Sequence, residues 1–114
     1  LKKENGSQLV TGVTIVRSDF LKENEEAVKL FIEDHKASAA YTSEHLDEAA
    51  EMVAALGIVE KAPIAKKAMP ACNIVCITGE EMKSALSGSL SVLEAADAKS
   101  VGGQLPADDF YYLP

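Results

Sequence analysis

The sequence has few aromatic residues and little positive charge. Trp is absent, and aromatic residues make up 5% of the 114 positions. A platform that stacks single-stranded nucleic acid needs several exposed rings, so this composition argues against that class of protein. The formal charge of -7, from 18 acids against 11 bases, argues against nucleic acid and anionic membranes as partners, because phosphate binding requires a concentrated basic face.

The sequence also lacks an apolar run of the length that crosses a membrane. Its first seven residues contain no hydrophobic stretch of the kind found in signal peptides, and we interpret residues 1–7 as a linker. The chain does not begin with Met, so we expect a processed product or an excised fragment. Its length corresponds to a single domain at most.

Cysteine and histidine are scarce, with two of each. In an extended segment Cys72 and Cys76 would lie about 13 Å apart, too far for a disulfide, whereas a helix would allow them to pair. His35 and His45 are distant from the cysteines and not at zinc spacing. We therefore expect two buried free thiols, a half-buried His35 and no metal site.

Two segments are rich in residues that favour strands. Residues 8–17 contain several Val and Thr residues, and both faces of a strand there would be partly apolar, which is typical of a strand covered on both sides. Residues 73–78 indicate a second short buried strand. Two strands do not make a good sheet by themselves, so they look like members of a sheet whose other strands are missing.

Helices are predicted over the rest of the chain. Asn24 is a good N-cap, Glu25 and Glu26 complement the dipole of the helix that follows, and Ser43 is a candidate cap for the next one. Gly57 is a natural stop. The expected ranges are 18–21, 25–42, 44–56, 63–68 and 80–96, followed by turns and an aromatic tail that docks on the core. The predicted fold class is α/β, helix-heavy with about two strands.

No constellation of residues indicates catalysis. The acid pairs lie at helix starts, where they act as caps, and the serines at 84, 87, 89 and 91 lack the G-x-S-x-G elbow. We therefore assign no catalytic residue and no cofactor. The most plausible ligand-contacting segment is 8–12, with Thr11 and Gly12 as candidate ligand-binding residues, because polar groups and a Gly near one end of a buried strand suit a cleft.

An ordered set of motifs from about Ser7 onward resembles the C-terminal portion of extracytoplasmic solute-binding proteins of ABC importers, of the nitrate, sulfonate, taurine and thiamine-precursor type. No single motif is diagnostic, but the set covers nearly the full length. The matching segments are Leu9-Val10-Thr11-Gly12-Val13-Thr14-Ile15-Val16-Arg17, Phe20-Leu21, Asn24-Glu25-Glu26-Ala27-Val28, Glu48-Ala49-Ala50-Glu51, Ala68-Met69-Pro70, Asn73-Ile74-Val75, Gly79-Glu80-Glu81-Met82-Lys83, Lys99-Ser100-Val101-Gly102-Gly103 and Leu105-Pro106.

The resemblance implies part of a type II periplasmic-binding-protein-like fold, two-lobed with a ligand cleft at the hinge. It implies a lipid-anchored or periplasmic protein, not an enzyme, that delivers a small solute to a membrane permease. Residues 10–17 would then be the strand that re-enters the first lobe. The first lobe's opening strands and the second lobe are absent from this sequence, so most of the ligand site is expected outside it, and its strand edges could pair with a second copy or with the missing part.

The sequence leaves two alternatives open. The chain could instead be a small helical interaction or regulatory module that is complete at this length. Within the transport interpretation the solute is undetermined: an anion would require Arg or helix N-termini, and Arg17 is the only arginine, at the far end of the predicted strand from Thr11. A heteroaromatic solute is equally open.

Overall fold

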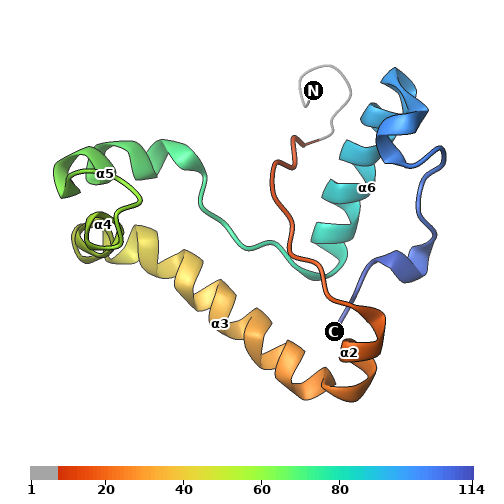
Figure 1. Cartoon of the computed structure of the whole chain (residues 1–114), viewed down its shortest axis with the longest axis horizontal. Coiled ribbons are helices and arrows are strands. Elements are labelled where there is room, and N and C mark those ends of the chain that lie inside the picture. The colour runs from red at the N-terminus through yellow and green to blue at the C-terminus, as the bar shows by residue number, and fades with distance from the viewer. Residues whose placement is uncertain (1–7) are drawn as a thin grey trace. The chain divides into compact units, whose positions relative to one another are not determined.

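The computed structural model describes residues 8–114, of which 67% are helical. The helices differ widely in length, and two of them, α3 and α6, account for about half of the helical residues (Figure 1). The elements in chain order are α2 (Ser18–Glu23), α3 (Glu25–Glu44), α4 (Leu46–Ala55), α5 (Ala62–Ala68), the 3-10 helix η1 (Met69–Cys72), α6 (Gly79–Ala96), and the 3-10 helices η2 (Ala98–Val101) and η3 (Asp108–Phe110).

The predicted α/β fold class is wrong. Residues 8–114 contain no strand and no sheet, and both segments expected to be strands, 8–17 and 73–78, have neither helical nor strand structure. The preference of Val and Thr for strands reflects packing on a pleated surface between neighbouring strands. A strand also needs a second strand for its hydrogen bonds, and neither segment finds one among the described residues.

The long helices lie close to where the sequence placed them, but their caps differ. Asn24 occupies the N-cap position of α3, yet its side-chain amide donates to the Phe20 carbonyl at 3.2 Å and caps no N–H group of α3. Ser43 does not cap α4. It lies in the last turn of α3 and its hydroxyl donates to the Ala40 carbonyl at 3.1 Å, while His45 occupies the N-cap position of α4.

The chain turns sharply after α4. Gly57 has φ of +78°, and its N–H donates to the Ala54 carbonyl at 3.0 Å. This left-handed conformation is one that Gly adopts without a steric penalty, which explains why the helix stops there. Pro63 lies in the first turn of α5, as predicted. Pro70 does not end the helical path at once, because η1 continues to Cys72 before Asn73, with φ of +52°, terminates it.

The chain divides into two compact units, which are described separately. The first consists of residues 8–17 with Ile77–Pro114, and contains α6, η2 and η3. The second, Ser18–Cys76, contains α2, α3, α4, α5 and η1. The expectation that residues 1–7 form a linker lies outside the described residues.

The second unit is built on alanine. Ala49 and Ala50 on α4 are buried against Ala65 on α5 and Met69 on η1, and we call these four residues the alanine cluster. Small side chains let the two helices approach closely, and α5 lies against α4 in Figure 1. Partly buried apolar residues surround the cluster, namely Tyr41, Leu46, Val53 and Val59.

The first unit is built on one aromatic residue from the C-terminal tail. Tyr111 is 8% exposed. The Lys83 ammonium of α6 lies 5.9 Å from the centre of its ring and 3.3 Å from a carboxylate oxygen of Asp108. The aromatic tail therefore docks on the body of its unit, as the sequence predicted.

Candidate functional site

Thr11 and Gly12 lie in the irregular segment that precedes α2, and both are exposed. A Cβ atom added to Gly12 would have no heavy atom within 4 Å, and Gly12 is not among the residues with a positive φ. A ligand can therefore approach the Gly12 Cα without meeting a heavy atom within 4 Å of the Cβ position.

The hydrogen-bonding groups of this segment are uncharged. Residues 8–16 carry no ionisable side chain, so the donors and acceptors are the backbone groups, the Gln8 amide and the hydroxyls of Thr11 and Thr14. Such groups can hydrogen-bond a polar or anionic ligand without neutralising its charge. The segment can position a solute, but it cannot supply a proton or a nucleophile activated by a neighbouring base.

A second candidate is a shallow recess of about 270 Å³ within the first unit. It lies between α6 and the tail, and one polar side chain, Gln104, accompanies its apolar lining. Typical ligand pockets hold about 300 to 1,000 Å³, so the recess is small for a metabolite. The residues that line it are Leu90, Val101, Gln104, Leu105, Pro106, Ala107 and Phe110.

The turn that forms this recess is held by specific contacts. The Asp97 carboxylate accepts from the Lys99 N–H at 3.1 Å, and the Ser100 hydroxyl donates to the Asp97 carbonyl at 2.7 Å. Gly102 and Gly103 follow with φ of +82° and +99°. The Gly-Gly pair is therefore a chain reversal, as the sequence indicated, and it belongs to no phosphate-binding loop.

One ion pair joins two helices of the second unit. Lys66 donates to Asp47 at 2.6 Å, and this hydrogen bond, aided by the carboxylate charge, raises the pKa of Lys66 above its ordinary value. The pair joins α5 to α4, and both side chains are exposed. Its chemistry is that of a surface ion pair.

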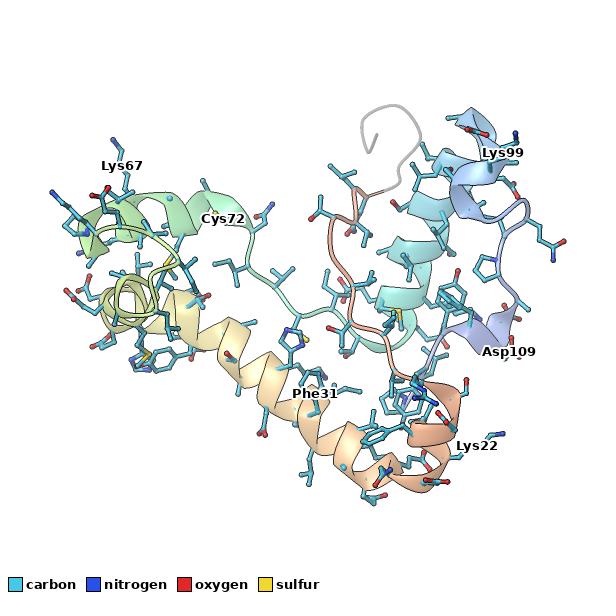
Figure 2. All side chains as sticks on the ribbon, in the orientation of Figure 1. Lys22, Phe31, Lys67, Cys72, Lys99 and Asp109 are labelled. Carbon is cyan, nitrogen blue, oxygen red and sulfur yellow. The ribbon has the colours of Figure 1, made fainter. Side chains whose placement is uncertain are left out.

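His35 and the two cysteines are more exposed than the sequence predicted. His35 is exposed, not half-buried, and its ring centre lies 5.7 Å from that of Phe31. Cys72 is exposed and Cys76 partly so; both are free thiols. Cys72 donates to the Ala68 carbonyl at 3.3 Å, as a side chain in the last turn of a helix does (Figure 2).

Residues 8–114 contain no group of three or more His, Cys, Asp or Glu residues placed to hold a metal ion. Over the same residues, no helix combines the length and the apolar character required to cross a membrane.

The sequence alone did not predict the recess or the Lys66–Asp47 pair. The recess forms because the turn at 97–103 returns the tail to α6, and the Gly-Gly pair was the available signal for that reversal. The ion pair joins residues that are 19 positions apart, and no local spacing rule connects them.

No family model, curated protein or solved structure matched this chain.

Proposed function

We propose that this chain belongs to the solute-binding component of an ABC importer, which captures a small organic or anionic solute outside the cytoplasmic membrane and delivers it to a membrane permease. Two things support the proposal: the ordered set of motifs that resembles this family, and the open, neutral backbone at Thr11 and Gly12. The second observation carries the structural part of the argument.

Solute capture needs hydrogen-bonding groups that remain accessible in the empty state. The Thr11 hydroxyl and the backbone on either side of Gly12 meet that requirement, because both residues are exposed and the space at the Gly12 Cα is open. In such sites a small number of placed polar groups orients the solute while other surfaces exclude water. The proposal therefore requires a second wall that closes over this segment when solute binds.

The proposal assigns no catalytic step. Binding and delivery require a location outside the cytoplasmic membrane, either in the periplasm or tethered by a lipid anchor, and that location is part of the proposal.

Solute binding by the protein isolated from its native cell tests the proposal. Titration calorimetry with taurine, an alkanesulfonate, nitrate and a thiamine pyrimidine precursor would show heat for at least one of them. Replacing Thr11→Val removes one hydroxyl at nearly constant volume, and we expect about fivefold weaker binding, the value of one hydrogen bond of about 1 kcal/mol. Thr42→Val on α3 is the matched control and leaves affinity unchanged, because the Thr42 hydroxyl lies outside this segment and donates to the Ala39 carbonyl of its own helix.

Two results would contradict the proposal. One is the absence of heat with every solute for a protein that is correctly folded. The other is recovery of the native protein in the cytoplasmic fraction, by immunoblot with an antibody against this chain, with none in the envelope.

A second candidate function is that of a helical protein-interaction module. It is favoured by large apolar side chains on the second unit that are exposed, among them Leu30 and Phe31 on α3 and Ile58 after α4. Phe31 is labelled in Figure 2. Exposed apolar side chains contribute to interaction sites where they gather into a patch. The same immunoblot separates the two functions, since a native species of the size of this chain favours the module and a severalfold larger one favours the solute-binding protein.

A further inference from the structure

Residues 8–16 combine three features of composition. They are uncharged, free of proline and rich in β-branched residues. Three of their aliphatic side chains are largely exposed, Leu9 at 68%, Val13 at 61% and Ile15 at 82%. Segments of this composition pair readily with another strand, because the backbone groups are unpaired and the side chains fit a pleated surface.

We propose that residues 8–16 bind the same segment of a second copy of this chain as an antiparallel pair of strands. The inference does not rest on the proposed function, because it is drawn from the composition and exposure of residues 8–16 alone. Solute binding is measured on the protein from its native cell, and self-pairing is measured on this chain. The failure of one leaves the other standing.

The charge distribution identifies the part of the surface where a second copy is repelled least. Two chains that each carry a formal charge of -7 repel one another over most of their surfaces. The nine residues from 8 to 16 contribute nothing to that charge, and the first ionisable residue after them is Arg17, whose charge is opposite to the net charge. Two copies can therefore approach through this segment at the lowest electrostatic cost.

The segment is also complementary to itself in one register. When Gly12 lies opposite Gly12 on a two-fold axis, Leu9 faces Ile15 and Thr11 faces Val13, each pair occurring twice. These four residues share one face of the paired strands, since side chains alternate. Cross-strand aliphatic pairs stabilise a ladder, and the open space at Gly12 leaves room for the second backbone to approach.

The pairing is expected to be weak, because a two-stranded ribbon by itself is marginally stable in water. The dimer should therefore appear as protein concentration rises and dissociate on dilution. Light scattering across a dilution series would show the mass rising from 12.1 kDa towards twice that value. The amide I infrared band of strand structure should grow in parallel, although the monomer has no strand in residues 8–114.

Two variants locate the contact. Ile15→Lys places a charge opposite Leu9 of the second copy and should abolish the dimer at every concentration. Val75→Lys is the matched control, because Val75 is 65% exposed and also lies in an irregular β-branched segment. It should dimerise as the parent chain does. A dimer that survives Ile15→Lys, or one that Val75→Lys abolishes, would overturn the assignment to residues 8–16.

A cross-link tests the register. In a chain with Cys72→Ser and Cys76→Ser, Gly12→Cys should form an intermolecular disulfide with diamide as oxidant, because opposite residues have Cα atoms about 5 Å apart. Ile15→Cys should not, since its two copies would lie about 20 Å apart. Cross-linking of Ile15→Cys alone would overturn the register. A monomer at all concentrations, or growth beyond a dimer, would overturn the proposal itself.

Discussion

The two compact units of this chain are stabilised in different ways. The second unit, Ser18–Cys76, buries alanines of α4 and α5 together with Met69 of η1, and Ala50 and Ala65 are 1% and 0% exposed. The first unit, residues 8–17 with Ile77–Pro114, buries only Tyr111 and Ser89 among its described residues. A core of several small residues depends on the close approach of helices, whereas a core centred on one ring depends on that ring. The units should therefore respond to different kinds of substitution.

The largest effect is expected at Tyr111, where the substitution Tyr111→Ala removes the one buried ring of the first unit. Burial of the ring and its contact with Lys83 are lost together, and we expect about 3 kcal/mol of destabilisation confined to this unit. Hydrogen exchange followed by mass spectrometry would report it as faster exchange in α6 and the tail. Tyr112→Ala, at the partly exposed neighbour, is the control with a smaller effect. Equal effects of the two variants would contradict the dependence on a single ring.

The next largest loss of stability is expected when a larger side chain is introduced into the close packing of the second unit. Ala65→Leu inserts three carbon atoms where the side chain has no exposed surface, and overpacking of this kind costs about 2 kcal/mol. Ala68→Leu adds the same atoms at an exposed position of the same helix and should be nearly neutral. Urea unfolding followed by circular dichroism compares the two midpoints. A midpoint for Ala65→Leu as high as that of Ala68→Leu would show that the α4–α5 interface tolerates a larger side chain.

A smaller loss of stability is expected from Gly→Ala at one turn in each unit, and it should be the same at the two turns. Gly57 and Gly102 have φ of +78° and +82°, and a Cβ at either position would meet no atom within 4 Å. The cost of Gly→Ala is therefore the backbone term alone, about 1 kcal/mol at both sites. Gly→Asn should cost less, because Asn adopts the left-handed region more readily. Thermal unfolding of the four variants measures this, and a much larger loss at one glycine would indicate a packing contact there.

The smallest effect is expected from the surface ion pair of the second unit. Because Asp47 raises the pKa of Lys66, the folded state binds that proton more tightly than the unfolded state. The resulting stability is fully present below the ordinary lysine pKa of 10.5 and is lost as pH rises through the higher folded value. Lys66→Met should lower the melting temperature slightly at neutral pH and make no difference in strong alkali. Lys67→Met on the same helix is the control.

The helices could be predicted from local signals, whereas the lack of strand structure in the described residues could not. Residues 25–42 and 80–96 were expected to be helical, and α3 and α6 cover those ranges with small shifts at the ends. Residues 8–17 have the composition of a strand, but strand structure needs a partner in space that composition does not provide. Ser43 illustrates the same limit on a smaller scale, since a serine suits a cap or a last turn equally, and packing selected the last turn.

The candidate site, too, could be predicted only in part from the sequence. Thr11 and Gly12 were selected from the sequence, and their exposure and the open space beside Gly12 came from the structure. The recess beside Gln104 depends on the return of the tail, and the Lys66–Asp47 pair on the packing of α5 against α4. Neither is visible in local spacing.

The sequence by itself determined the helical segments, the turns at Gly57 and Gly102 and the uncharged character of residues 8–16. Each of these follows from backbone preference or side-chain chemistry within a few residues. Only the tertiary structure decided that residues 8–17 and 73–78 remain without strand structure, which alanines are buried and where Tyr111 docks. Those outcomes depend on which distant residues meet, and burial rewards a contact only when both partners are present.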